Sequence, residues 1–196
     1  MPSDRISLDR LLGEIHACRL CEAQLPLGPR PVLRASGSAR LLIVGQAPGT
    51  KVHASGVPWD DASGRRLREW LQIDTDTFYD AARVAIVPMG FCYPGKGASG
   101  DLPPRRECRD TWHPRLLPLL GGVELTLLVG QYAQAGFLRA RRKSTLGETV
   151  RAWRDYLPQY LPLPHPSPRN VGWFKANPWF EGEVLPALRE RVRTLL

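Results

Sequence analysis

Residues 41–49 read LLIVGQAPG, four large aliphatic side chains followed by a turn rich in glycine and proline. A short, uninterrupted apolar run is typical of a strand that is buried on both faces, as in a parallel sheet. Glycine lets the backbone N–H groups of the turn approach a ligand closely. The turn lacks the lysine and hydroxyl residues of a phosphate-binding loop, and it does not match the G-x-G-x-x-G dinucleotide pattern. The stretch therefore predicts a buried strand that ends either in a ligand-binding turn or in a plain tight turn.

Three more apolar runs follow along the chain, and segments with helical spacing of apolar residues lie around and between them. Strands are predicted at residues 41–44, 84–87, 123–129 and 160–163, and helices at 7–17, 105–120, 131–141, 180–196 and from a cap at Ser63. Residues 92–104 are rich in glycine and proline and are predicted as a long loop. Strands that alternate with helices indicate a parallel sheet with both faces covered. We expect an α/β fold, a three-layer α/β/α sandwich around a central four-stranded parallel sheet.

The composition is that of a globular chain with excess positive charge. At 196 residues, 43% of them hydrophobic, one domain over residues 1–196 is expected. No apolar stretch suits a transmembrane helix, and residues 1–12 lack the apolar core of a signal peptide. The net charge of +8 favours a polyanionic partner such as nucleic acid, although a basic soluble protein would show it too. We expect a cytoplasmic monomer, in which thiols stay reduced.

The chain has four cysteines, Cys18, Cys21, Cys92 and Cys108. Two residues separate the first pair, and fifteen separate the second. A close pair from one turn and two distant single cysteines are what a tetrahedral four-thiolate site requires. In a reducing compartment a metal site is favoured over two disulfides. The spacing alone leaves open whether the site holds Zn²⁺ or an iron–sulfur cluster.

Residues 56–61 read GVPWDD and combine an aromatic side chain with two carboxylates. Trp59 is suited to stack on a flat base. Alternatively, Trp59 belongs to the core, and Asp60 and Asp61 lie near the positive end of a helix dipole.

Residues 165–170 read HPSPRN and follow the fourth predicted strand. The prolines predict a rigid turn that holds the imidazole of His165 at the edge of the sheet. Arg169 and Asn170 then face whatever the turn approaches. A lone histidine is often structural, but ligands of parallel sheets bind at the carboxyl ends of strands, where this one lies.

Together these segments resemble the uracil-DNA glycosylase superfamily. The strand followed by GQAPG resembles the first motif of its family 4 members, which carry a four-iron four-sulfur (4Fe-4S) cluster. The HPSPRN segment is similar to the second motif of the family 1 and single-strand-selective branches. The cysteine spacing resembles the way in which family 4 holds its cluster. The resemblance spans residues 7–193 and implies a uracil-DNA glycosylase-like fold, with a cluster-binding turn at 18–21.

The resemblance implies a base-excision repair enzyme that flips uracil out of DNA and hydrolyses its N-glycosidic bond. His165 would stabilise the negative charge that develops on the uracil carbonyl. Trp59 would stack on the base, and the backbone of the turn at Gly45, Gln46 and Ala47 would contact its edge. Ser167, Arg169 and Asn170 would hold DNA phosphates and fill the gap left by the flipped base. No lysine is clearly placed for Schiff-base lyase chemistry, so a monofunctional enzyme is expected.

The source of a carboxylate to activate water is left open. Ala47 stands where family 1 has a water-activating Asp, and Gln46 stands where family 4 has Glu. Asp60 is the preferred substitute because it follows Trp59 directly, with Asp61 and His53 as further candidates. Water that attacks unaided after the bond breaks is the remaining alternative.

Base specificity is also open, because Pro88 stands where family 4 reads uracil with Asn. The backbone of Met89 and Gly90 is the expected replacement. Uracil in DNA is the expected substrate, and hypoxanthine or xanthine is the alternative. Family 4 relatives that cross-link to DNA carry a basic, histidine-containing insert after the stacking aromatic residue. No such insert follows Trp59, so covalent capture of DNA is not expected. A different class of function, a damaged- or abasic-DNA binding module with little catalysis, remains a second hypothesis.

The resemblance implies that Cys18, Cys21, Cys92 and Cys108 hold a structural 4Fe-4S cluster. The cluster would pin the turn after the first helix to the segment between residues 92 and 108. Zn²⁺ is the alternative, and with it a zinc-stabilised nucleotide-binding protein.

Overall fold

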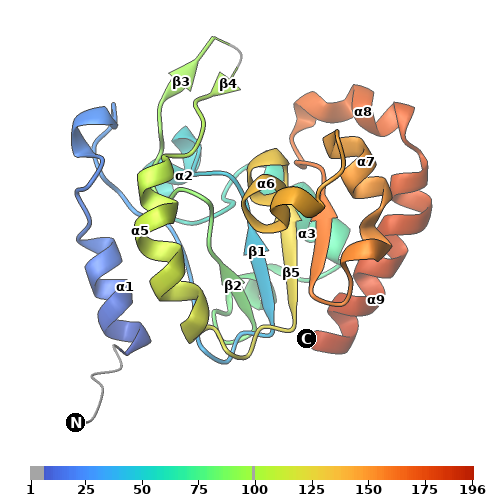
Figure 1. The fold of residues 1–196 in the computed structure, drawn as a ribbon, viewed down its shortest axis with the longest axis horizontal. Coiled ribbons are helices and arrows are strands. Elements are labelled where there is room, and N and C mark those ends of the chain that lie inside the picture. The colour runs from blue at the N-terminus through green and yellow to red at the C-terminus, as the bar shows by residue number, and fades with distance from the viewer. Residues whose placement is uncertain (1–6, 99) are drawn as a thin grey trace.

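The computed structural model describes residues 7–98 and 100–196. Its centre is a parallel sheet in the order β2-β1-β5-β6 (Figure 1). The strands are β1 (Leu41–Val44), β2 (Val84–Ile86), β5 (Leu125–Val129) and β6 (Tyr160–Leu163). All three pairings are parallel. The four predicted strands and their parallel arrangement are therefore confirmed.

Both faces of the sheet are buried, and alternate residues of β1 serve the two faces. Leu41 and Ile43 belong to one hydrophobic core, and Leu42 and Val44 belong to the other. The first core is closed by side chains from α3 (Ala62–Leu71), α7 (Leu146–Arg151) and α9 (Leu185–Leu195). The second core is closed by side chains from α1 (Leu8–His16), α5 (Arg106–Leu116) and α6 (Gln131–Leu138). This arrangement is the predicted three-layer α/β/α sandwich.

Several short elements were not predicted. Residues 92–104 are not a plain loop, because they contain a two-stranded antiparallel hairpin that projects beyond the carboxyl edge of the parallel sheet (Figure 1). Helices α5 and α6 end earlier than predicted and continue as single 3₁₀ turns. A π-helical turn precedes α9. The elements missed were α2 (Thr50–Ser55), β3 (Lys96–Gly97), β4 (Gly100–Asp101), α4 (Thr75–Tyr79) and α8 (Val171–Ala176), together with α7.

Helix α3 is capped by Asp61, and the predicted cap at Ser63 is wrong. Oδ1 of Asp61 accepts a hydrogen bond from the N–H of Gly64 at 2.8 Å. A carboxylate at this position satisfies a free N–H group and interacts favourably with the helix dipole. Ser63 instead lies inside the first turn and is buried.

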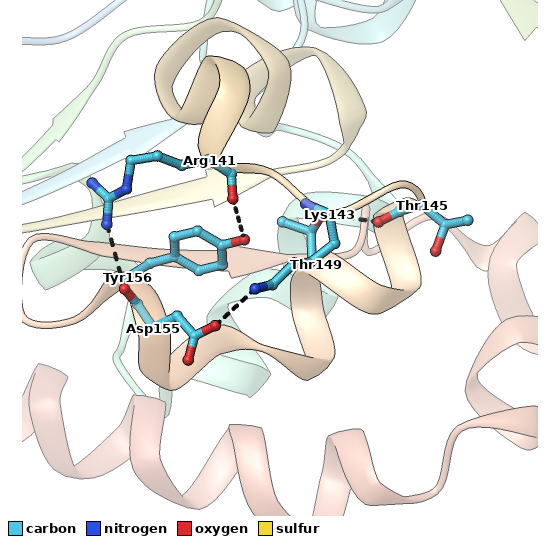
Figure 2. Close-up of polar contacts among 6 residues, drawn as sticks. All are labelled: Arg141, Lys143, Thr145, Thr149, Asp155 and Tyr156. Atoms are coloured by element: carbon cyan, nitrogen blue, oxygen red, sulfur yellow. Dashed lines mark hydrogen bonds and ion pairs between the residues drawn. The ribbon is translucent and has the colours of Figure 1, made fainter.

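The connection from α6 to β6 is tied down by polar contacts (Figure 2). The hydroxyl of Tyr156 donates to the carbonyl oxygen of Arg141 at 3.0 Å, and Lys143 forms an ion pair with Asp155 at 3.0 Å. Thr149 accepts from the N–H of Lys143 at 3.1 Å. These contacts fix the segment that leads into β6, and therefore the turn that follows β6. No helix within residues 7–98 and 100–196 has the length and apolar character needed to span a membrane.

Candidate active site

A cavity of about 710 Å³ lies at the carboxyl edge of the parallel sheet, where ligands of such sheets bind. Its wall includes the turn after β1, the start of α3, Pro88 after β2, the β3–β4 hairpin, the start of α6 and the turn after β6. The fold thus brings segments that are distant in sequence around one space. The predicted site residues on this wall are Gly45, Gln46, Ala47, Trp59, Asp61, His165, Ser167, Arg169 and Asn170.

Trp59 lies on this wall against two glycines. A Cβ at Gly45 would lie 2.8 Å from Cζ2 of the indole, and a Cβ at Gly64 would lie 1.7 Å from the carbonyl oxygen of Trp59. The backbone of Trp59 has a φ of 59°, a conformation that is unusual for a bulky residue. The indole and the imidazole of His165 have centroids 5.7 Å apart. The two glycines therefore allow the indole to pack between the first turn and the imidazole.

His165 is held by hydrogen bonds on either side of it. The side-chain amide of Asn170 donates to the carbonyl oxygen of His165 at 2.8 Å. Two residues earlier, the carbonyl oxygen of Leu163 accepts from the N–H of Gly130 at 2.9 Å and from the buried amide of Gln134 at 3.0 Å. These bonds fix the backbone on which the imidazole is mounted, as expected for a side chain that must meet a ligand at a set position.

Asp61 lies on the cavity wall, and Asp60 does not. Burial lowers the pKa of His165, and the charge of Asp61 partly opposes this, so the imidazole is neutral near pH 7. Asp60 is exposed, and its charge contributes to raising the pKa of Tyr79, after the larger effect of burial. Because successive residues at a helix start point in different directions, the side chain next to Trp59 in sequence is not the one beside it in space. The preference for Asp60 over Asp61 is therefore not supported.

His53 also lies away from the cavity. Its ring is 6.2 Å from that of Tyr93, and its Nδ1 is buried without a hydrogen-bond partner. Burial lowers its pKa, and the nearby positive charge of Arg30 lowers it further. The six-residue helix α2 directs this side chain to its inner face, so His53 is a poor candidate to activate water at the site.

The backbone N–H groups of Met89 and Gly90, which were expected to set base specificity, already have partners in the structure. The N–H of Met89 donates to the carbonyl oxygen of Gly45, and that of Gly90 donates to the carbonyl oxygen of Gln46, each at 2.9 Å. These bonds continue the pairing of β1 and β2 beyond the strands. The side chain of Met89 is buried against Gly136. Neither residue lines the cavity, and their contribution is to fix the turn that does.

The comparison with protein families agrees with this geometry. Residues 34–189 match the family described as the Uracil DNA glycosylase superfamily. The chain belongs to this superfamily. Membership supports a DNA glycosylase, a hydrolase that acts on DNA in repair. The matched region includes Cys92 and Cys108, whereas Cys18 and Cys21 precede it.

Polar residues of the glycosylase cavity that the sequence did not indicate include Lys51, Asp101, Gln131 and Tyr132. Gln131 and Tyr132 follow the glycine at the end of β5, and this position at a strand end was a usable signal. Lys51 is exposed at the start of α2. No sequence signal indicated Asp101, because a hairpin within a predicted loop carries it to the cavity.

Pro88 lies on the glycosylase cavity wall, with its carbonyl oxygen directed to a buried histidine. Nε2 of His113 lies 3.0 Å from that oxygen. Since a carbonyl oxygen can only accept, Nε2 carries the proton. Burial lowers the pKa of His113, so the ring is neutral. His113 stacks on Phe91 and belongs to α5, so the position that distinguishes this chain from family 4 is anchored by α5.

The four cysteines of the glycosylase line a second, apolar cavity beside α5. All four are free thiols. Burial raises the pKa of Cys92 to about 11 and that of Cys108 to about 12. The N–H of Phe91 lies 3.3 Å from Sγ of Cys108, a donor of the kind that stabilises a metal-bound sulfur. Among residues 7–98 and 100–196, no three Cys, His, Asp or Glu side chains are grouped closely enough to hold a single metal ion. Four thiols around one cavity are the type of donor that a sulfur-ligated centre would require.

Proposed function

We propose that this chain is a monofunctional uracil-DNA glycosylase that leaves an abasic site in DNA. One observation carries the proposal: the turn 45–49, Trp59 and His165 line a single cavity at the carboxyl edge of the sheet. Parallel topology explains why the turn 45–49 and His165 lie at one edge of the sheet, and Trp59 is brought between them by the start of α3. A cavity with an aromatic wall, free backbone groups and an imidazole suits a flipped base.

DNA would approach the rim of the cavity, where basic and polar side chains gather. Arg169 is exposed on a turn in which Oγ of Ser167 accepts the N–H of Arg169 at 3.2 Å. Arg66 donates to the carbonyl oxygen of Ser167 at 3.3 Å, so the turn is also tied to α3. A rigid turn with an exposed guanidinium is suited to grip a phosphate or to fill the space left by the base.

Bond cleavage would rely on His165 as a neutral hydrogen-bond donor. As the glycosidic bond lengthens, negative charge develops on uracil and positive charge on the sugar. A neutral imidazole N–H directed at the uracil carbonyl stabilises this charge without proton transfer, and it needs no reorganisation during the reaction. The pKa of His165 is lowered, first of all by burial, so the ring is a neutral donor at neutral pH. This protonation state is the one that the proposed role requires.

Cleavage without lyase activity is proposed because the cavity offers no desolvated amine. Lys51 lies on the wall, but its side chain is exposed. A Schiff-base lysine is normally activated by an apolar or cationic surrounding. Strand cleavage would therefore require subsequent alkali.

We further propose that Cys18, Cys21, Cys92 and Cys108 hold a 4Fe-4S cluster, as in the family 4 type. Four free cysteines around one apolar cavity and an N–H donor to sulfur support this assignment. Zn²⁺ is the alternative ligand of the same thiols. The group would supply a structural cross-link between the end of α1 and the segment 92–108, and no step of the reaction passes through it.

A second substrate class is favoured by Pro88. This residue has no N–H and no side-chain donor, and its carbonyl oxygen is engaged by His113. The pocket therefore lacks the amide with which family 4 reads uracil. A glycosylase for hypoxanthine or xanthine is the alternative that this observation supports.

The test is a panel of duplex and single-stranded oligonucleotides with one uracil, hypoxanthine or xanthine, incubated with the chain and then treated with alkali. We expect alkali-dependent cleavage at uracil and the strongest signal there. Stronger cleavage at hypoxanthine or xanthine than at uracil would identify a deaminated purine as the substrate in place of uracil. Absence of cleavage with all three bases, together with tight binding to abasic DNA, would support the non-catalytic DNA-binding hypothesis instead.

A further inference from the structure

The glycosylase turn after β1 brings no carboxylate to the cavity. Neither Gln46 nor Ala47 has a carboxyl group. Within residues 7–98 and 100–196, the carboxylates on the cavity wall are those of Asp61 and Asp101. Asp61 already uses Oδ1 to cap α3 through the N–H of Gly64. The other carboxylate arrives from a different segment altogether.

Asp101 belongs to β4 and reaches back over the first turn. Its Oδ2 lies 3.4 Å from the point at which a Cβ on Gly49 would stand. The carboxylate therefore lies beside the end of the GQAPG turn. The hairpin that carries Asp101 is closed by pairing of Lys96 with Asp101 and by the N–H of Leu102, which donates to the carbonyl oxygen of Gly95 at 2.8 Å.

Charged groups from each neighbouring segment face Asp101. Asp101 is exposed where it lines the cavity. Partial desolvation raises the pKa of its carboxyl group, Arg169 and Lys96 act to lower it, and Asp61 acts to raise it. The guanidinium of Arg169 lies 3.4 Å from the Cβ position of Gly100, next to Asp101. Tyr93 is the remaining titratable neighbour, and its pKa is raised by burial and then by Asp101. Arg169 and Lys96 favour the ionised carboxylate, whereas desolvation and Asp61 favour its protonation.

We propose that Asp101 is the general base of the glycosylase, the residue that accepts a proton from the attacking water. This inference rests on the proposed function. It assigns the catalytic carboxylate to the β3–β4 hairpin, outside both sequence motifs.

The step balances as a hydrolysis. The water oxygen forms a bond to C1′ of the deoxyribose while the bond from C1′ to the base nitrogen breaks. The electron pair of the broken bond goes to the base, whose carbonyl receives the hydrogen bond from His165. The water proton passes to the carboxylate of Asp101 and then to solvent or to the departing base.

The test compares the wild-type chain with Asp101→Asn, Asp101→Glu, Asp61→Asn and the control Asp76→Asn. Asp76 is exposed on α4, at the opposite edge of the sheet, and its substitution changes the net charge equally. Single-turnover rates of base release are measured across pH, with binding to abasic DNA measured in parallel. We expect Asp101→Asn to slow the rate by about 10²–10⁴-fold and to flatten the acidic limb of the pH profile. DNA binding should be equal or tighter, since a negative charge is removed, and Asp101→Glu should restore part of the rate.

Three outcomes would overturn the assignment. Near-normal rates in Asp101→Asn would leave the carboxylate without a chemical role, and a large loss confined to Asp61→Asn would transfer that role to Asp61. If the rate of base release by Asp101→Asn returned to normal at saturating protein concentration, Asp101 would be a DNA-binding residue and not the base. If the wild-type chain releases no base, the proposed function fails instead, so the two failures are distinguishable.

Discussion

His165 is the residue on which the proposed chemistry depends most. Its imidazole is partly buried, neutral and mounted on a backbone that Asn170 and Gln134 hold from either side. A donor that is fixed in advance stabilises developing charge better than one that must reorient. His165 would therefore stabilise mainly the transition state and would contribute little to the affinity for DNA.

We predict that His165→Ala lowers the single-turnover rate by about 10²–10³-fold, because one preorganised donor to the developing charge is lost. His165→Asn retains an N–H donor and should recover part of the rate. Binding to abasic DNA should change little in both variants. A variant without imidazole that turned over at the normal rate would contradict the role given to His165.

His113 shows how a buried residue outside the cavity supports it. The neutral ring donates to the carbonyl oxygen of Pro88 and has a lowered pKa because of burial. Below about pH 6.5 an unfolded histidine gains a proton that the folded ring does not accept, so this contribution to stability falls as the pH falls. The contribution of the neutral His113 ring to the free energy of unfolding is therefore present at neutral pH and decreases below about pH 6.5.

We predict that His113→Phe costs about 1–3 kcal/mol of unfolding free energy near neutral pH, because the carbonyl oxygen of Pro88 loses its partner. Since the variant lacks the titrating ring, the difference from wild type should shrink between about pH 7 and pH 5. Urea unfolding at a series of pH values measures this difference. A gap that stays constant or grows in acid would show that the ring is not neutral in the folded chain.

At the scale of elements, the start of α3 is shaped by close approach of backbone to backbone. A Cβ at Gly64 would meet the carbonyl oxygen of Trp59 at 1.7 Å, whereas a Cβ at Gly13 in α1 would meet nothing within 4 Å. Both glycines lie inside helices, so replacing either one by alanine changes helix propensity by a similar amount. A difference in stability between the two variants therefore measures the contact with Trp59.

We predict that Gly64→Ala destabilises the chain by about 1–3 kcal/mol or more and displaces Trp59, because backbone must move to admit the methyl group. Gly13→Ala is the matched control and should stabilise by about 0.4–1 kcal/mol. Thermal unfolding and tryptophan fluorescence measure the two effects. Equal stability of the two variants would mean that the turn at Trp59 is loose.

The elements that could be predicted are those with enough length to show a pattern. Each core strand is a short, mostly apolar run, and α1, α3, α5, α6 and α9 show helical spacing over two turns or more. Helices α2, α4, α7 and α8 have five or six residues, too few for a clear periodicity. The hairpin has two-residue strands that carry no pattern at all. The start of α3 was missed although its cap is local, because Asp61 and Ser63 are both suitable N-cap residues.

The same reasoning separates the predicted from the unpredicted parts of the site. The turn at 45–49 and His165 follow strand ends, which parallel topology places at one edge. Asp101 reaches that edge through a hairpin whose path no local signal indicates. The N–H groups of Met89 and Gly90 form hydrogen bonds to the carbonyl oxygens of Gly45 and Gln46, which only the three-dimensional pairing reveals.

At the scale of the whole molecule, α5 connects the cysteine cavity to the glycosylase cavity. It carries Cys108 near its start and His113 further along, and Phe91 contacts both residues. A clamp at the cysteines would therefore stabilise the segment that presents Pro88, without contributing to the chemistry.

We predict that chain purified without oxygen contains iron and acid-labile sulfide, and that Cys108→Ser loses both and unfolds at a lower temperature. In a chain of this size, each 1 kcal/mol lost from the free energy of unfolding lowers the thermal unfolding midpoint by about 2–4 °C. Metal analysis and calorimetry provide the measurement. Stoichiometric zinc in place of iron would favour the other occupant, and an unchanged midpoint in Cys108→Ser would remove the structural role of these thiols.

The most direct measurement is the identity of the base released from DNA. The chain is incubated in excess with a duplex that contains a single uracil, and the free base is detected by mass spectrometry before any alkali is added. The account predicts one equivalent of uracil, an intact strand until alkali treatment, and loss of the product when His165 is replaced by Ala. Release of no base, or release that persists in His165→Ala at the full rate, would contradict it.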